Sequence, residues 1–256
     1  MMPAILRGAR AAFVFLTRIP VGGFPYRPED WRWSTAHFPL VGACLGAMLA
    51  VSLAWLRGGL GITAAAWIVL ALSLLVTGAF HEDGLADTSD ALGGAFDRDK
   101  LFVILKDSRI GSFGAVALIV ALGAKIALLS RLDEAAPMAL FVVSTLGRLY
   151  PIALMTVMPY ATRPDEAKSR DVARAGVAQL ALATLWTALA LGIATFVLGL
   201  GLVELARAVV VSGIVTTLLA WRFHKRAGGI TGDFLGTTEQ LVEVAALAAL
   251  AWEAPR

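Results

Sequence analysis

The sequence has little of what disulfide-stabilised domains and transition-metal proteins use. It contains one cysteine, Cys44, and three histidines among 256 residues. A single thiol cannot form an internal disulfide, and this set of residues is too small for a zinc or iron–sulfur site. Any functional metal ion is therefore expected to be a hard cation that binds oxygen ligands.

Charge is scarce as well. Only 16% of the residues are charged, against about 25% in ordinary soluble domains. By contrast, 58% are hydrophobic and the mean hydropathy is +0.76. A surface with so little charge is expected to face lipid rather than water. The 22 basic residues are scattered among loops instead of forming a stripe, which argues against a nucleic-acid partner.

Long apolar runs predict a helical membrane protein. Strand-like alternation is missing from them, and a bilayer admits only helices or closed barrels. We expect an all-α fold, a single membrane domain over residues 1–256, and six or seven transmembrane helices. Five runs are long enough to cross a core of about 30 Å, near residues 36–56, 62–80, 111–130, 137–158 and 176–203, and two less certain ones lie at 208–223 and 234–252.

The basic residues alternate between the two sides of such a bundle. With seven spans, sixteen fall on the side of the N-terminus and four on the other, and Lys125 and Arg148 lie inside spans. The positive-inside tendency places the N-terminus and the long loops in the cytoplasm. Lys125 is expected to play a structural role, and its long stem can carry the charge to the membrane surface; Arg148 should face an internal cavity. Residues 5–16 suit either a helix on the membrane surface or a frayed terminus.

The strongest chemical signal is an acidic segment after the second apolar run. Seven of the 19 acidic residues lie between Glu82 and Asp107. If the helix continues into this segment, Asp83, Asp87 and Asp90 share one face and Glu82 flanks it. The glycine pair at 93 and 94 is then expected to end this helix. These carboxylates would repel one another unless they take up protons or bind a cation, and Mg²⁺ would leave positions open for phosphate oxygens. A solvated acidic helix end is the alternative interpretation.

Two later segments bring cations and glycines to the same predicted side. Lys106 and Arg109 precede a glycine-flanked helix start, which favours phosphate; ordinary positive charge beside a membrane is the alternative. The glycine-rich segment 225–236 suits a phosphate-cradling turn or a hinge, and its Asp233 is a further candidate metal ligand. His81 is a candidate base, although most histidines are ordinary hydrogen-bonding residues.

Together these motifs resemble the signatures of the adenosylcobinamide-GDP ribazoletransferase family, also called cobalamin synthases. The resemblance runs in order from the N-terminus to about residue 240. It rests on Phe15-Leu16-Thr17-Arg18-Ile19-Pro20, on Phe80-His81-Glu82-Asp83-Gly84-Leu85-Ala86-Asp87 with Asp90, on Lys106-Asp107-Ser108-Arg109-Ile110-Gly111, and on Lys225-Arg226 with Gly228-Gly229 and Thr231-Gly232-Asp233.

The resemblance implies a Mg²⁺-dependent, multi-pass enzyme of the bacterial inner membrane. It would join adenosylcobinamide-GDP to α-ribazole or its 5′-phosphate, release GMP and form adenosylcobalamin or its 5′-phosphate. A ribose hydroxyl would attack the cobinamide-linked phosphorus, and positioning and charge would do most of the work. The oligomeric state is left open.

The expected site residues form three groups. The candidate catalytic residues are Asp83, Asp87, His81, Lys106 and Arg109. The candidate substrate-binding residues are Lys106, Arg109, Arg148, Lys225, Arg226, Gly229, Thr231 and Asp233. The candidate metal ligands are Glu82, Asp83, Asp87, Asp90 and Asp107.

Two other functions stay open. The acidic motif is loosely similar to that of the CDP-alcohol phosphotransferases of phospholipid synthesis, but it has Asp87 after Ala86, where their pattern has arginine, and their later aspartate pair is missing. A cation or metabolite transporter is the other alternative. It should bury its ionisable groups near the bilayer midplane, whereas most acidic residues here lie in or beside loops.

Overall fold

The computed structural model describes residues 3–22, 25–161 and 174–252. Within these ranges the chain is helical apart from its turns and one isolated backbone bridge between Tyr160 and Ile230, which confirms the all-α fold class. The helices are α1 (Ala4–Leu16), α2 (Pro28–Ser34), α3 (Phe38–Leu60), α4 (Ile62–Thr77), α5 (Phe80–Gly94), α6 (Arg98–Leu105), α7 (Ser112–Leu132), α8 (Ala136–Val157), α9 (Val177–Phe196), α10 (Leu202–Ala227) and α11 (Gly232–Leu250), with 3-10 turns η1 (Thr35–His37) and η2 (Asp133–Ala135).

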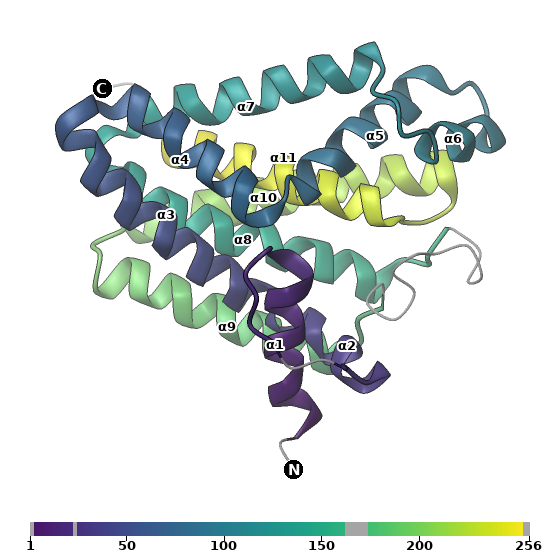
Figure 1. The fold of residues 1–256 in the computed structure, drawn as a ribbon, viewed down its shortest axis with the longest axis horizontal. Coiled ribbons are helices and arrows are strands. Elements are labelled where there is room, and N and C mark those ends of the chain that lie inside the picture. The colour runs from purple at the N-terminus through teal and green to yellow at the C-terminus, as the bar shows by residue number, and fades with distance from the viewer. Residues whose placement is uncertain (1–2, 23–24, 162–173, 253–256) are drawn as a thin grey trace.

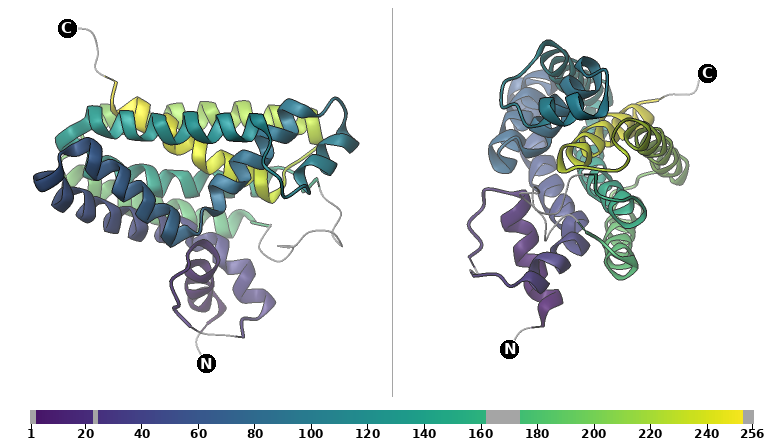
Figure 2. Two further views of the ribbon diagram at one scale, coloured as in Figure 1. Left: turned by 45° about the horizontal axis from the view of Figure 1, so that its top comes forward. Right: turned by 90° about the vertical axis from the view of Figure 1, so that its right-hand side faces the viewer.

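The long helices run along the longest axis of the molecule, and successive loops alternate between its two ends (Figure 1). The turns before α4, α8 and α10 lie at the left-hand end of that view, and the segments before α7 and α11 lie at the right-hand end. The N-terminal helices α1 and α2 project from one side of the bundle, and α1 crosses the long axis (Figure 1, Figure 2). Ala12 and Leu16 of α1 pack against Phe38 and Val41 of α3. Residues 5–16 thus belong to an ordered helix rather than a frayed terminus, and its place on the membrane surface stays a prediction.

Four helical segments in the described ranges are long and apolar enough to cross a membrane, or five if α4 and α5, bent by 91°, count as one span. The expected six or seven spans are not confirmed. One reason is that α4 has only 16 residues, and another is that α11 carries Glu239 and Glu243 in its middle. The four segments are Pro28–Leu60, Ser112–Val157, Val177–Phe196 and Leu202–Ala227. The second of them comprises α7, η2 and α8.

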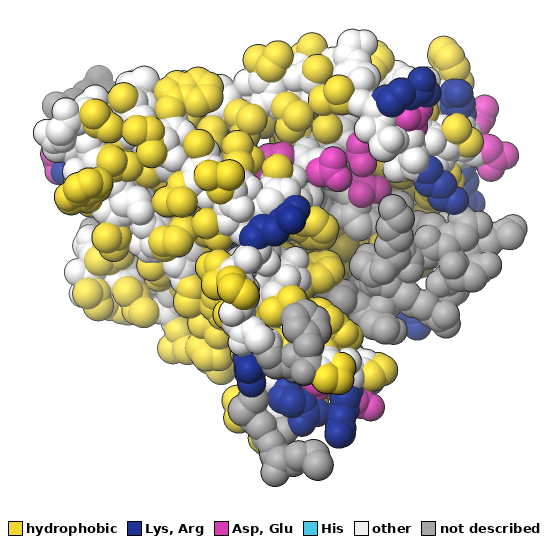
Figure 3. Space-filling model, in the orientation of Figure 1, with side chains coloured by type: hydrophobic (Ala, Val, Ile, Leu, Met, Phe, Trp, Pro, Cys, Tyr) yellow, Lys and Arg dark blue, Asp and Glu magenta, His cyan; other side chains and the backbone are white. Residues whose placement is uncertain are grey.

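The outward faces of these helices are apolar. Trp55, Leu75 and Ile119 each expose more than 70% of their surface. Figure 3 shows hydrophobic side chains over most of one face, with Lys and Arg concentrated at its right-hand end and around α1 and α2. Such a wide apolar surface is unfavourable in water, so a multi-pass membrane protein is the consistent interpretation.

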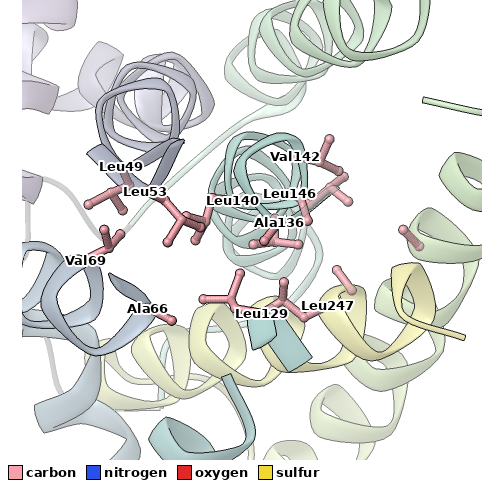
Figure 4. Close-up of a cluster of buried hydrophobic side chains, with 14 of the residues drawn as sticks. Leu49, Leu53, Ala66, Val69, Leu129, Ala136, Leu140, Val142, Leu146 and Leu247 are labelled. Atoms are coloured by element: carbon pink, nitrogen blue, oxygen red, sulfur yellow. The ribbon is translucent and has the colours of Figure 1, made fainter. Parts of the chain in front are cut away.

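Inside the bundle, leucine, valine and alanine side chains from α3, α4, α7, α8 and α11 form one core (Figure 4). α3 and α8 approach most closely where α3 carries Gly42 and Gly46. A Cβ atom at Gly42 would collide with the carbonyl oxygen of Ser144, and one at Gly46 would lie 2.9 Å from that of Leu140. Small residues four apart are a common way for membrane helices to come together.

The last helix, α11, is a central element rather than an outer span. It packs against α5, α7, α8 and α10, and Figure 2 shows it among those helices in the end-on view. Its buried residues include Thr238, Glu239 and Gln240. The expected run at 234–252 therefore lies inside the bundle, and the neighbouring run at 208–223 is part of the longer helix α10.

Replacing Gly42 by alanine should weaken the contact between α3 and α8. The added methyl group cannot be accommodated without moving backbone, which costs about 1–3 kcal/mol of unfolding free energy. Thermal unfolding in detergent is the measurement. Gly123→Ala is the matched control, because a Cβ atom there meets no atom within 4 Å. Equal melting temperatures for the two variants would contradict the packing described for α3.

Candidate active site

The acidic segment forms its own helix, α5, because the chain is broken before it. Gly78 and Ala79 both have positive φ angles, 70° and 55°, which end α4 and turn the next helix by 91°. A single helix through residue 80 was expected, so this break corrects the sequence prediction. α5 nevertheless ends at Gly94, as the glycine pair at 93 and 94 predicted.

α5 and α11 cross in close contact at two glycines. A Cβ atom at Gly84 would lie 2.9 Å from the carbonyl oxygen of Asp233, and one at Gly236 would lie 3.2 Å from that of His81. The hydroxyl of Thr237 donates a hydrogen bond to the carbonyl of Gly84 at 2.9 Å. This crossing brings the first turn of α11 to the acidic face of α5.

The carboxylates of Asp83, Asp87 and Asp233 lie near enough at that crossing for their charges to interact. Asp83 is exposed and Asp87 is half-buried, and Figure 3 shows acidic side chains gathered over α5. Burial, together with the negative charges of Asp83, Asp233 and Asp90, raises the pKa of Asp87 from 3.8 to about 6. In the described part of the chain, no three Asp, Glu, His or Cys side chains stand close enough to hold a metal ion by themselves. The arrangement is a site of concentrated negative charge.

Two of the expected metal ligands, Asp90 and Asp107, bind other groups of the protein. Asp90 accepts hydrogen bonds from the backbone N–H groups of Gly111 at 2.7 Å and Gly114 at 2.9 Å, so its carboxylate caps the start of α7. Asp107 binds the guanidinium of Arg109 at 2.7 and 3.0 Å. These bonds lower the pKa of Asp107 to about 2. Both carboxylates thus serve local structure in this conformation.

The glycine-rich segment also has structural partners. The guanidinium of Arg226 donates to the carbonyls of Leu92 at 3.2 Å and Ala95 at 2.6 Å and so caps the end of α5. Gly229 is required because a Cβ atom there would collide with the carbonyl of Pro159. Thr231 caps α11, where its hydroxyl accepts from the N–H of Phe234.

The remaining cations lie near the same end of the molecule. Lys106 is exposed at the end of α6. The side chain of Arg109 is 86% exposed and pairs with Asp107. Lys225 is exposed and lies over the ring of Trp221, with its ammonium 5.2 Å from the ring centroid. Exposed cations of this kind can change partners at little cost.

Behind the acidic face lies a buried charge network that the sequence did not reveal. Lys125 donates to Gln240 at 2.8 Å and to Glu243 at 2.6 Å. Nη1 of Arg148 lies 2.9 Å from a carboxylate oxygen of both Glu243 and Glu239. Lys125 is 4% exposed and does not reach the membrane surface, which corrects the expectation for this residue. It remains inside because an ammonium in an apolar bundle is most stable beside a carboxylate.

Glu82 belongs to this inner network rather than to the acidic face. One of its carboxylate oxygens accepts from the amide of Gln240 at 2.8 Å, and the other is buried without a hydrogen-bond partner. His81 also points inward, with Nδ1 3.8 Å from Glu239. His81, Arg148 and Glu239 line one pocket, which confirms that Arg148 faces a cavity.

Comparison with known proteins decides the family. The cobalamin-5-phosphate synthase family model matches residues 8–251. The chain belongs to the cobalamin-5-phosphate synthase family. No solved structure matches the chain.

Proteins similar to this chain are named adenosylcobinamide-GDP ribazoletransferase. The protein of Leptothrix cholodnii is 39% identical over 96% of both chains. That of Albidiferax ferrireducens is 37% identical over 95% of this chain and 97% of its own, and that of Vibrio cholerae is 35% identical over 95% and 94%. The resemblance found in the motifs is thus confirmed.

In this member of the cobalamin-5-phosphate synthase family, the sequence motifs lie close together, but their residues have different roles. Asp83, Asp87 and Asp233 come together, whereas Asp90, Arg226, Gly229 and Thr231 shape the helix ends around them. Glu239, Gln240 and Glu243 were missed as site residues. The available signal was the pair of glutamates in the last apolar run, which was interpreted only as evidence against a membrane span.

Lys125→Met should destabilise the protein by about 3–5 kcal/mol, because it leaves buried Glu243 with one cation fewer. The unfolding midpoint in detergent checks this. Lys100→Met, at an exposed lysine, is the control and should change the midpoint little. A double variant, Lys125→Met with Glu243→Leu, should recover part of the loss. Equal midpoints for both single variants would rule out a stabilising role for the network.

Asp87→Asn should stabilise the metal-free protein at pH 7. The folded state binds the Asp87 proton more tightly than the unfolded chain, so stability falls as pH rises from 3.8 through about 6. The full effect would approach about 3 kcal/mol, and solvent screening of this half-exposed group reduces the expected gain to about 1 kcal/mol. The measurement is the melting temperature of the wild type and of Asp87→Asn in chelator between pH 4.5 and 7.5, a range of about three units around the raised pKa. Parallel curves of melting temperature against pH for the two proteins would contradict the prediction.

Proposed function

We propose that this chain transfers the cobinamide phosphate of adenosylcobinamide-GDP to α-ribazole or its 5′-phosphate. The oxygen of a ribose hydroxyl forms the new bond to the cobinamide-linked phosphorus, the bond to the GMP oxygen breaks, and the hydroxyl proton is released. This reaction is the final step of cobalamin assembly. Membership of the family and the relatives' shared name support it.

The observation that carries the proposal is the meeting of Asp83 and Asp87 with Asp233 across the glycine crossing. Transfer between phosphate esters needs positioning and charge neutralisation more than covalent help from the protein. A surface that concentrates carboxylates next to exposed cations provides both. The carboxylates attract a divalent cation, and the cations attract phosphate oxygens.

We further propose that Asp83, Asp87 and Asp233 hold Mg²⁺. Their crowding fits this ion, because their repulsion would be relieved by a cation. Mg²⁺ usually binds one or two carboxylates and takes its other ligands from water and substrate phosphates, so it needs no preformed group of three protein ligands. When bound, it would neutralise charge on the pyrophosphate.

The three exposed cations would steady the phosphates. Lys106, Arg109 and Lys225 would contact non-bridging oxygens of the pyrophosphate, and Arg109 would exchange its bond to Asp107 for one to the substrate. This exchange replaces one charge-assisted hydrogen bond with another of similar strength. Arg226, Gly229 and Thr231 would act by holding the segments in place.

We place the enzyme in the bacterial inner membrane with this end in the cytoplasm. Two features support the orientation: the excess of Lys and Arg on this side, and the charge of the substrates, which keeps them in water. The alternatives from the sequence, a CDP-alcohol phosphotransferase and a transporter, lose support because the matching relatives are named for another reaction.

Asp83→Asn and Asp87→Asn should each lower turnover at least about 100-fold, since each removes a ligand charge from the proposed site. GMP release from adenosylcobinamide-GDP by the purified protein in liposomes is the measurement, with and without Mg²⁺. Asp99→Asn, at an exposed aspartate on α6, is the matched control. Activity in chelator, or normal turnover of both site variants, would refute the metal site. Release of CMP from a CDP-lipid instead of GMP would favour the phospholipid enzyme.

A further inference from the structure

A pocket with aromatic walls lies beside the acidic face. Phe15 of α1, Phe38 of α3 and Phe80 of α5 line it. The rings of Phe15 and Phe38 are stacked with centroids 5.7 Å apart, and Phe80 meets Phe15 edge to face at 5.3 Å. The residues that form this wall come from three helices far apart in the sequence. Flat aromatic surfaces of this kind suit a flat apolar ligand.

The pocket is also lined by three buried polar side chains. His81 is 6% exposed, Arg148 3% and Glu239 1%. Nδ1 of His81 lies 3.8 Å from a carboxylate oxygen of Glu239. The Nε atom of Arg148 is buried without a hydrogen-bond partner. A buried polar group without a partner is unfavourable, so this nitrogen favours a ligand with a hydrogen-bond acceptor beside it.

The pocket adjoins the proposed site of phosphate transfer. Gly232 and Gly236 form part of its lining, and Asp233 stands between them in the chain. His81 likewise precedes Glu82 and Asp83 on α5. A ligand whose ring occupies this pocket would therefore hold its remaining part close to the three carboxylates.

We propose that this pocket binds the benzimidazole base of the nucleoside substrate, an inference that rests on the proposed function. The dimethylbenzimidazole of α-ribazole is flat and apolar and carries two methyl groups. Once one ring nitrogen is bonded to ribose, the other is its only hydrogen-bonding atom. That pattern matches a pocket with aromatic walls and a few buried polar groups. Guanine fits less well, because donors and acceptors occupy most of its edge.

The test is a set of variants of the full chain in liposomes. Phe80→Ala and Phe15→Ala should each raise the KM for α-ribazole about tenfold, since each removes a wall of the ring site. The KM for adenosylcobinamide-GDP should stay within about twofold. Phe80→Tyr should behave like the wild type, because it keeps the ring. Phe96→Ala, at a fully exposed phenylalanine outside the pocket, should change neither constant.

Direct binding separates this inference from the proposed function. The fluorescence of α-ribazole is titrated with wild-type protein and with each variant in the absence of the second substrate. Binding that Phe80→Ala weakens about tenfold supports the pocket, even if the wild type releases no GMP. Normal turnover with unchanged α-ribazole constants in both alanine variants would overturn the pocket and leave the function standing. A raised KM for adenosylcobinamide-GDP alone, or displacement of the bound nucleoside by GMP, would also overturn it.

Discussion

The attachment of two buried cations to the carboxylates of α11 determines where the rest of the site can be. Glu239 and Glu243 could not enter an apolar bundle alone, and Lys125 and Arg148 make their burial possible. With α11 held against α7 and α8, its first turn reaches α5, and the glycine crossing brings Asp233 beside Asp83 and Asp87. The outer helices contribute an apolar surface toward the lipid, and the chemistry is concentrated around this inner helix.

Around that helix, structural and chemical roles are divided among residues of the same type. Asp90 caps α7, while Asp87, one turn earlier on α5, faces other carboxylates. Arg226 closes the end of α5, while neighbouring Lys225 is exposed. The caps fix the ends of the helices that carry the reactive groups. This arrangement is typical of sites in which a rigid scaffold holds a few charged side chains in place.

The sequence predicted the features that depend on composition and local signals. These include the helical membrane class, the end of α5 at its glycine pair, the start of α7 after Gly111, and a cavity beside Arg148. It failed where partners far apart in the chain decide the outcome. Hydropathy could not distinguish a lipid-facing helix from the central helix α11. Spacing could not show that Asp90 caps a helix that begins more than 20 residues later, because a capping carboxylate and a metal-binding one have the same residue type.

The position of α11 at the end of the described chain has a consequence for biogenesis. A segment with two glutamates in its middle is a poor substrate for insertion into lipid on its own. Its partners Lys125 and Arg148 lie on helices that leave the ribosome earlier. Lys125 and Arg148 therefore enter the bilayer before the carboxylates that pair with them, and Asp233 can join Asp83 and Asp87 only after α11 has docked.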